Sequence, residues 1–272
     1  MNSVSTGTFP RIVATDLDGT LLSSTGSVSP RTRKALQSAR AAGAEIVFVT
    51  ARPPRAVRDI ARPADVTGTA ICSNGAIVYD VTADEYTVTS PLAPDVAREV
   101  AGSLSRALPG VGLAVETGTN VLTEAAYTRR VDHDRAAYRE VGSIFDEDHP
   151  IVKLLALSSA HTADELYAVV SGAIGDLAEV THSGVEGLLE ISAPGTTKAV
   201  ALDRLCRDRG VGPAEVVAFG DMPNDLAVLL YAGAGYAMAN AHHLVLSAAG
   251  HRTLSNDEDG VAVVLETLLA RA

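Results

Sequence analysis

Two short apolar runs, far apart in the chain, each lead into a pair of aspartates. Residues 11–15 (RIVAT) are followed by Asp16 and Asp18, and residues 215–219 (EVVAF) are followed by a loop whose first aspartate is Asp221. A short apolar run bounded by a polar loop is typical of a strand that is buried on both faces of a parallel sheet. A parallel sheet of such strands needs helices on both of its faces.

The residues that follow the first of these runs alternate between helix and strand patterns. Ser29 and Pro30 have the signature of an N-cap followed by the first residue of a helix, which is expected to end at Gly43. Residues 45–49 (EIVFV) are predicted to form the next strand, and residues 70–72 a third. Strand, helix and strand joined by short links predict a right-handed βαβ unit and therefore a parallel sheet.

The middle of the chain has a different pattern. There we predict short strands at 86–89, 112–115 and 152–157 and helices at 94–108 and 162–174. From Leu188 the alternation returns, with a strand at 188–191, a helix at 197–209, the strand at 215–219, a helix at 224–230 and a last helix at 260–270. We therefore expect an α/β fold, with a doubly wound parallel-sheet (Rossmann-like) core domain of residues 1–80 and 188–272. Residues 81–187 are expected to form an inserted α+β cap domain.

Composition narrows the class of protein. Apolar residues make up 47% of the 272 residues and charged residues 20%, as in a globular protein. The net charge of −11 argues against a nucleic-acid partner, and no apolar run is long enough to predict a membrane helix. The polar N-terminal segment lacks the features of a signal peptide, so we expect a cytoplasmic protein in which Cys72 and Cys206 are free thiols.

The first acidic loop predicts a metal site. Because ligands bind beyond the carboxyl ends of parallel strands, Asp16 and Asp18 are expected at a site. Two carboxylates two residues apart cannot both be buried without a partner; a divalent cation is the natural one, and Mg²⁺ prefers oxygen ligands. The alternative is an Asx-type turn in which Gly19 supplies an unusual backbone angle.

The second acidic loop is predicted to converge on the first. Asp221 would then bind the same ion as Asp16, and Asp225, one helical turn further on, would orient ligands or waters. Alternatively, Asp225 is a charge near a helix N-terminus that interacts favourably with the helix dipole.

Two further residues have the chemistry of phosphate binding. Thr50 ends a predicted strand, where its hydroxyl and the following N–H groups could hold a phosphoryl oxygen, although it could equally cap the helix that follows Pro53. Lys198 stands at the start of a predicted helix, where a cation opposes the dipole. It is therefore either a phosphate-binding ammonium group or an ordinary solvated lysine.

Taken together, four segments resemble the motifs of the haloacid-dehalogenase (HAD) superfamily of phosphohydrolases. They are Asp16-Leu17-Asp18-Gly19-Thr20, Thr50, Lys198 and Gly220-Asp221-Met222-Pro223-Asn224-Asp225. More narrowly, the chain is similar to the Cof-type sugar-phosphatase branch through residues 73–76 (SNGA), 189–191 (LEI), 233–241 (GAGYAMANA) and 255–261 (SNDEDGV). The similarity covers both ends of the chain, whereas the middle matches a cap only in length and position.

The resemblance implies a Mg²⁺-dependent phosphatase that acts on a small phosphomonoester such as a sugar phosphate. In such an enzyme Asp16 would be the nucleophile that forms an aspartyl-phosphate. Asp18 would protonate the leaving oxygen and then act as base on the hydrolytic water. The metal would be held by Asp16, the backbone carbonyl of Asp18 and Asp221, with Asp225 behind them.

The resemblance also implies which residues bind the substrate. The phosphoryl group would be bound by Thr50, the Ala51 N–H and Lys198, with the Leu17 N–H and Asn224 as further contacts. Asn74 and Gly75 are expected to contact substrate near the cap, although Asn-Gly is also typical of a hairpin tip.

The chain departs from the branch at two positions. Ala51 and Ala199 stand where glycine is usual, so a methyl group is expected to crowd the phosphate at Ala51 and to tighten packing against the cap at Ala199. Neither departure removes a catalytic group, and both bear on turnover and substrate range.

The same residues are compatible with two other functions. A phosphotransferase or phosphomutase would need the same residues, and a binding protein that has lost activity is a third alternative. The physiological substrate and the oligomeric state are not predicted. Neither are the cap residues that set specificity, whose polar candidates are Arg129, Arg130, His133, His182 and Glu186.

Overall fold

The computed structural model describes residues 9–62, 66–129, 132–183 and 185–271. They form two compact units. The first consists of the described residues up to Thr87 and from Lys198 onward, and the second of Val88–Thr197. The first unit is therefore built from two separate stretches of the chain, and the second from one continuous stretch between them.

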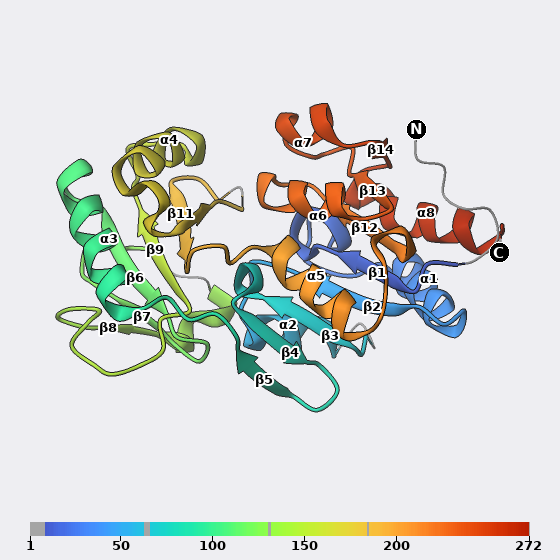
Figure 1. Cartoon of the computed structure of the whole chain (residues 1–272), viewed down its shortest axis with the longest axis horizontal. Helices are drawn as coiled ribbons and strands as arrows, with labels where there is room; N and C mark the ends of the chain where they lie inside the picture. The colour runs from blue at the N-terminus through green and yellow to red at the C-terminus, as the bar shows by residue number, and fades with distance from the viewer. Residues whose placement is uncertain (1–8, 63–65, 130–131, 184, 272) are drawn as a thin grey trace. The chain divides into compact units, whose positions relative to one another are not determined.

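In the described part of the chain, the sheet of the first unit has eight strands in the order β14-β13-β12-β1-β2-β3-β4-β5 (Figure 1). The strands are β1 (Ile12–Thr15), β2 (Glu45–Val49), β3 (Thr69–Cys72), β4 (Ile77–Asp80), β5 (Glu85–Val88), β12 (Val216–Gly220), β13 (Ala234–Ala237) and β14 (His251–Arg252). From β14 to β3 all neighbouring strands are parallel, and β4 runs antiparallel to β3. Strands β1 and β12 are buried along their whole length, as the two apolar runs predict.

Helices pack on both faces of this sheet. They are α1 (Pro30–Ala41), α2 (Pro54–Ala61), α5 (Lys198–Asp208), α6 (Leu226–Tyr231), α7 (His243–Ala248) and α8 (Gly260–Leu269). The connections β1–β2 and β12–β13 leave the centre of the sheet in opposite directions, so right-handed crossovers place α1 and α6 on opposite faces. Helix α1 packs against α8, and α6 packs against α5. The predicted doubly wound, Rossmann-like core is confirmed.

The start of α1 agrees with its sequence signature. The Ser29 hydroxyl oxygen accepts a hydrogen bond from the Thr32 N–H, and Pro30 occupies the first helical position. The helix ends before Gly43, whose φ of 98° is readily adopted only by glycine.

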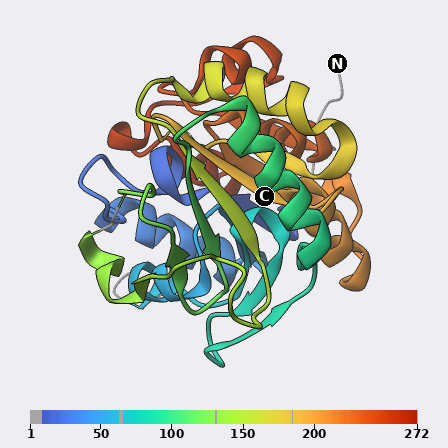
Figure 2. The same cartoon turned by 90° about the vertical axis from the view of Figure 1, so that its left-hand side faces the viewer.

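The second unit contains a six-stranded sheet in the order β10-β11-β9-β6-β7-β8 within the described residues. Its strands are β6 (Gly112–Glu116), β7 (Val121–Thr123), β8 (Tyr138–Glu140), β9 (Lys153–Leu157), β10 (Glu179–Thr181) and β11 (Leu188–Ser192). All pairings are antiparallel except β7–β8. Helices α3 (Pro94–Ala107) and α4 (Ala163–Ile174) pack together over one face, and Figure 2 shows the unit from the helix side. The α+β character predicted for the middle of the chain is therefore confirmed.

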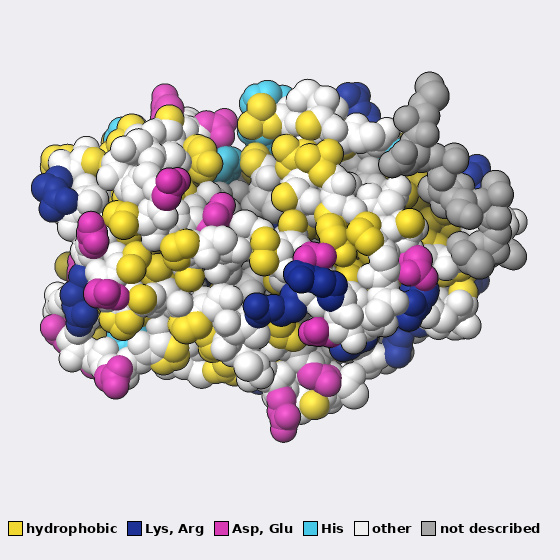
Figure 3. Space-filling model, viewed as in Figure 1, with side chains coloured by type: hydrophobic (Ala, Val, Ile, Leu, Met, Phe, Trp, Pro, Cys, Tyr) yellow, Lys and Arg dark blue, Asp and Glu magenta, His cyan; other side chains and the backbone are white. Residues whose placement is uncertain are grey.

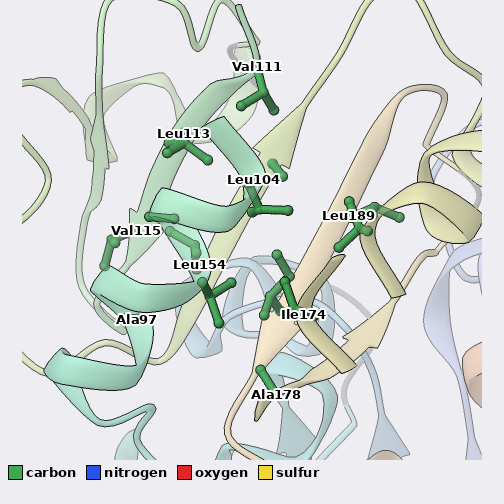
Figure 4. Packing of buried hydrophobic residues seen from close by; sticks show 14 of the residues in the cluster. Ala97, Leu104, Val111, Leu113, Val115, Leu154, Ile174, Ala178 and Leu189 are labelled. Atoms are coloured by element: carbon green, nitrogen blue, oxygen red, sulfur yellow. The ribbon is translucent and has the colours of Figure 1, made fainter. Parts of the chain in front are cut away.

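The core of the second unit lies between these helices and the sheet (Figure 4). Leu104 of α3 and Ile174 of α4 meet Leu113, Leu154 and Leu189 from three adjacent strands. Because side chains alternate along a strand, every second residue of these strands is available to this cluster.

The strand predicted at 188–191 forms, but its predicted place in the core sheet is wrong. Strand β11 lies between β9 and β10 in the sheet of the second unit. Leu189 and Ile191 pack into the cluster of Figure 4, whereas Leu188 packs on the opposite face. A short apolar strand has the same sequence pattern in either sheet, so the pattern alone could not assign it. The second unit continues to Thr197.

Two other expectations need correction. The strand predicted at 86–89 was assigned to the middle domain, but β5 (Glu85–Val88) is the edge strand beside β4 in the first unit's sheet. The helix predicted to begin at Asn224 begins at Leu226, after a single turn at Pro223–Asp225. In that turn the Asp225 carboxylate accepts hydrogen bonds from the N–H groups of Asp221 and Met222. Such local bonds between a side chain and the backbone compete with the α-helix.

On the face shown in Figure 3, Lys and Arg side chains lie beside Asp and Glu side chains and alternate with apolar ones. Cys72 and Cys206 are buried free thiols, as predicted. Among the described residues, no helix combines the length and apolar character needed to span a membrane.

Candidate active site

The predicted site residues follow the carboxyl ends of neighbouring parallel strands in the first unit. Asp16 follows β1, Thr50 follows β2, and Asp221 follows β12, while Lys198 begins α5. Parallel strands end at one edge of their sheet, which is where doubly wound proteins bind ligands. The contacts described below show that three of these residues, Asp16, Asp221 and Lys198, come together.

Asp16 is buried, with 6% of its surface exposed. Its N–H donates to the Phe219 carbonyl at 3.1 Å, and its Oδ1 accepts from Lys198 Nζ at 2.9 Å. Burial raises the pKa of Asp16 well above its ordinary value; Lys198 opposes this shift, and the carboxylates of Asp225 and Asp221 add to it. A carboxylate in these surroundings needs more positive charge nearby to remain ionised.

Lys198 is only 1% exposed and lies between two carboxylates. Its Nζ donates to Asp16 Oδ1 at 2.9 Å and to Asp225 Oδ1 at 2.7 Å. Burial by itself would lower the pKa of Lys198, but the two carboxylates outweigh it and raise the pKa above its ordinary value. Lys198 is therefore a buried cation at the site, and the alternative of a solvated lysine is wrong.

Asp221 completes an acidic cluster. Its Oδ1 accepts from the Thr20 hydroxyl at 2.6 Å. Burial and the neighbouring Asp225 raise the pKa of Asp221 to about 7, although the Thr20 hydrogen bond and Lys198 act in the opposite direction. One carboxylate oxygen each from Asp16, Asp221 and Asp225 lies within 4.8 Å of the others, a spacing that can hold a metal ion.

Asp225 has no carboxylate oxygen without a partner. Oδ1 accepts from Lys198, and Oδ2 accepts from the N–H groups of Asp221 and Met222 at 3.1 and 3.0 Å. These bonds hold both the ammonium group and the loop that carries Asp221. Asp225 is therefore suited to positioning the other two groups, and Asp16 and Asp221 are better suited to direct metal contact.

The turn after Asp16 depends on Gly19. Its φ is 71°, and a Cβ atom at this position would overlap the carboxylate of Asp221. Asn240, in the loop after β13, donates from Nδ2 to the Gly19 carbonyl at 2.8 Å. The glycine thus serves both the backbone conformation and the close approach of the two acidic loops.

Asp18 has a different environment from Asp16. Its side chain is 53% exposed and forms a two-point ion pair with Arg52. Arg52 Nε donates to Oδ2 and Nη2 donates to Oδ1, both at 2.6 Å. Sequence reasoning did not select Arg52 as a site residue, although it stands in the Thr50-Ala51-Arg52 segment.

Thr50 is buried at the end of β2, and its Oγ1 accepts from the Arg52 N–H at 3.1 Å. The hydroxyl proton of Thr50 is therefore directed elsewhere and can serve an anion. The N-cap of α2 is Pro53, so the alternative role of Thr50 as that cap is wrong.

Ala51 does not have a left-handed backbone, so alanine causes no backbone strain there. Ala199, in the first turn of α5, is partly exposed.

Asn74 and Gly75 lie in the tight connection between the antiparallel strands β3 and β4, as the hairpin alternative predicts. The Asn74 N–H donates to the Thr50 carbonyl at 3.0 Å, and its Oδ1 accepts from Asn224 Nδ2 at 3.2 Å. Ser73 and Asn74 both have positive φ, 51° and 57°, although neither is glycine. This strained connection therefore touches two of the predicted phosphate-binding residues.

The remaining predicted residues can be placed only in part. Leu17 is fully buried beside Asp16. Of the cap candidates, Arg129, His182 and Glu186 belong to the second unit, and Arg130 and the His133 side chain lie outside the described residues. His182 Nε2 lies 3.2 Å from Asp164 Oδ1.

Three residues around the site were missed: Thr20, Arg52 and Asn240. Thr20 and Asn240 stand within segments quoted for the family resemblance, and Arg52 follows Thr50 closely. Their position within or beside these segments was therefore the sequence signal that could have identified them as site residues. Their partners, however, are 34 to 221 residues away along the chain, so only the fold reveals what they bind.

The chain is similar to known phosphatases along nearly its whole length. The phosphatase YwpJ of Bacillus subtilis is 30% identical over 95% of this chain and 100% of its own length. Pyridoxal phosphate phosphatase YbhA of Escherichia coli is 29% identical over 93% of this chain and 96% of its own. A crystal structure of a haloacid dehalogenase-like hydrolase from Bacteroides thetaiotaomicron matches with a TM-score of 0.78 and 27% identity, covering 95% of this chain and 99% of that one.

The match to a family extends over nearly the whole chain. The family model of the haloacid dehalogenase-like hydrolases covers residues 13–265, which include both acidic loops, Lys198 and the complete second unit. The chain therefore belongs to the haloacid dehalogenase-like hydrolases and is a phosphatase of that family.

Proposed function

We propose that this phosphatase hydrolyses a small phosphomonoester, such as a sugar phosphate, through a phosphorylated Asp16 in a Mg²⁺-dependent reaction. The observation that carries the proposal is the contact between Asp16 and Lys198 in a buried acidic cluster at the end of β1. A buried carboxylate with an ammonium group at 2.9 Å can attack a phosphorus atom whose oxygens the ammonium group also attracts.

In the first step a carboxylate oxygen of Asp16 forms a bond to phosphorus, and the bond from phosphorus to the ester oxygen breaks. Asp18 gives a proton to the departing oxygen, which leaves as an alcohol. In the second step Asp18 takes a proton from a water molecule, whose oxygen attacks the phosphorus. The acyl-phosphate bond breaks, Asp16 is restored, and inorganic phosphate is released.

The residues present fit a magnesium ion. Asp16 and Asp221 supply oxygen donors, and burial together with neighbouring carboxylates raises the pKa of both, so a divalent cation would stabilise their ionised forms. The Asp18 carbonyl is the third proposed ligand. Bound Mg²⁺ would offset negative charge on the phosphoryl oxygens.

Phosphoryl binding is proposed for residues around this cluster. The Thr50 hydroxyl proton, the Ala51 and Leu17 N–H groups, Lys198 and Asn224 would donate to the phosphoryl oxygens. Lys198 keeps its position through Asp225, and Asn224 through Asn74. We further propose that Asn74 and Gly75 contact the substrate, and that the second unit selects it.

A phosphate-release assay tests this proposal. The wild-type protein and the Asp16→Asn variant are compared on sugar phosphates, nucleotides, pyridoxal phosphate and flavin mononucleotide, with and without Mg²⁺. We expect Asp16-dependent release of phosphate that needs the metal and no acceptor alcohol. Transfer of the phosphoryl group only to an added alcohol, as in a phosphotransferase, or equal release by both proteins, would contradict the proposal.

A further inference from the structure

The ion pair between Asp18 and Arg52 joins the loops that follow β1 and β2. Each oxygen of the Asp18 carboxylate accepts one Arg52 N–H, and both distances are 2.6 Å. A guanidinium group that binds both oxygens fixes the plane of the carboxylate as well as its distance. The Asp18 side chain is therefore oriented, although it is 53% exposed.

The Arg52 end of the pair is held from the backbone. Its N–H donates to Thr50 Oγ1 at 3.1 Å, and its carbonyl accepts from the Ser73 N–H at 3.0 Å. Ser73 is fully buried and has a φ of 51°, which costs conformational energy in a residue other than glycine. The strained, buried connection at Ser73 thus fixes the backbone of Arg52, whose side chain binds Asp18.

This arrangement bears directly on proton transfer. In the proposed reaction, Asp18 must direct one oxygen to the leaving group and later to a water molecule. A surface carboxylate turns freely among several rotamers, and each misdirected rotamer lowers the fraction of productive complexes. A two-point partner removes most of these rotamers before the substrate arrives.

We propose that Arg52 is the positioning residue of Asp18. It orients the carboxyl group through two hydrogen bonds, and one of these bonds is given up by the Asp18 oxygen that carries the proton and passes it to the leaving oxygen. The inference rests on the proposed function, since it assigns Arg52 to the acid–base step of that reaction. It differs from a direct role in phosphoryl binding, which the position of Arg52 two residues after Thr50 would also allow.

The two roles predict different kinetics for Arg52→Ala. A residue that acts through Asp18 affects proton donation, which matters for an alkyl ester such as a sugar phosphate and little for an aryl ester with a good leaving group. We therefore expect the kcat of Arg52→Ala to fall roughly tenfold or more on a sugar phosphate, within the range of general acid–base assistance. On p-nitrophenyl phosphate, the rate of phospho-enzyme formation should change by less than about threefold, with KM nearly unchanged.

A double-mutant comparison isolates the path through Asp18. In the Asp18→Asn background, Arg52→Ala should have almost no further effect, because its partner no longer performs proton transfer. Arg52→Lys keeps the positive charge but supplies no planar fork, so it should recover only part of the lost activity. Arg31→Ala is the matched control, because Arg31 makes a similar two-point pair with Glu266 between α1 and α8, and neither residue is among the candidate site residues.

Several outcomes would overturn the inference. Equal losses on both esters with a raised KM would assign Arg52 to phosphoryl binding. Additive losses in the double variant would separate Arg52 from Asp18, and complete recovery by Arg52→Lys would show that charge and not orientation matters. A lowered melting temperature with unchanged kinetics would make the pair purely structural.

Failure of the inference can be distinguished from failure of the proposed function. All these comparisons are made in a wild-type enzyme whose phosphate release is lost in Asp16→Asn. If that loss does not occur, the proposed function is wrong. If it occurs and the Arg52 variants behave otherwise than expected, only the positioning role is wrong.

Discussion

Four aspartates follow the ends of two neighbouring strands, and their surroundings give them different chemistry. Asp16 faces a buried ammonium group, Asp221 accepts from a hydroxyl, and Asp225 has both oxygens occupied. Asp18 is half exposed and paired with an arginine. Of the four, only Asp18 has an exposed side chain that a leaving oxygen and a water molecule could both reach, which supports the proposal that it acts as acid and base.

The proposed role of Asp18 predicts a dependence on the leaving group. Asp18→Asn should slow cleavage of a sugar phosphate by about 10²- to 10⁴-fold, because the departing alkoxide needs a proton. Formation of the phospho-enzyme from p-nitrophenyl phosphate should be slowed far less, and the intermediate should persist because the base is missing. Rapid-quench trapping with both substrates measures this. Equal slowing with no accumulation would assign Asp18 to structure or to metal binding.

Gly19 provides a test of the approach between the acidic loops. In Gly19→Ala the methyl group would overlap the Asp221 carboxylate, so the variant should need a higher Mg²⁺ concentration for half-maximal activity. Gly26→Ala is the control, because Gly26 has a similar φ of 76° but no atom within 4 Å of the place that a Cβ would take. Both variants should lose about 1–2 kcal/mol of stability to backbone strain.

Magnesium titrations of the two glycine variants give the decisive comparison. An unchanged Mg²⁺ dependence in Gly19→Ala would show that Asp221 can move without consequence. The same shift in both variants would attribute the effect to backbone strain alone.

At the level of single residues, the sequence could predict the acidic loops and Lys198, because residue type and position at a strand end are visible in it. It left Lys198 undecided between a solvated and a buried role, since burial depends on how α5 packs. Thr20 and Arg52 were not selected, because their roles depend on contacts with Asp221 and Asp18 that only folding creates.

At the level of elements, the alternation of strand and helix predicted the first unit well. Strands β1, β2 and β12 and helix α1 form where apolar runs and a Ser-Pro signature indicate them. Strand β11 was assigned to the wrong sheet, because its partners β9 and β10 cannot be read from its own composition. Pairing is a long-range property, whereas periodicity is local.

The corrected place of β11 has an energetic consequence. Glu190 of β11 accepts from Lys153 Nζ of β9 at 2.7 Å, and both side chains are less than 10% exposed. Lys153→Met should lower the free energy of unfolding by about 3–5 kcal/mol, because it leaves a buried carboxylate without this partner. Combining it with Glu190→Leu should recover most of the loss.

Urea unfolding followed by circular dichroism measures the effect in the single and double variants. The exposed pair of Arg31 and Glu266 is the control, and Arg31→Ala should leave the unfolding midpoint nearly unchanged. If the double variant is less stable than Lys153→Met, the loss of stability in Lys153→Met does not come from leaving Glu190 without its ion-pair partner.

At the level of the whole molecule, the described contacts of the candidate site lie within the first unit, although its residues come from both separate stretches of that unit. The site can therefore form only when residues before Thr87 and after Lys198 have come together. The second unit contributes its own sheet and core.

Metal removal tests the acidic cluster in the intact protein. EDTA should abolish phosphate release, and added Mg²⁺ should restore it. The reason is that Asp16 and Asp221 supply oxygen ligands in a buried acidic cluster. Among the described contacts, the positive charge beside this cluster comes from Lys198. Ca²⁺, which is larger and less demanding in geometry, should restore less activity. Full activity in metal-free buffer would contradict the proposed site.

If Asp16 carries the phosphoryl group, single-turnover trapping should detect phosphorylated protein. Wild-type enzyme mixed with Mg²⁺ and a ³²P-labelled substrate should yield acid-stable, hydroxylamine-sensitive label on Asp16. Asp16→Asn should fold normally, take up no label and keep less than about one per cent of the wild-type kcat, a loss of at least about 2.7 kcal/mol in transition-state stabilisation. Label on another residue, or a higher residual kcat in Asp16→Asn, would show that Asp16 is not the nucleophile.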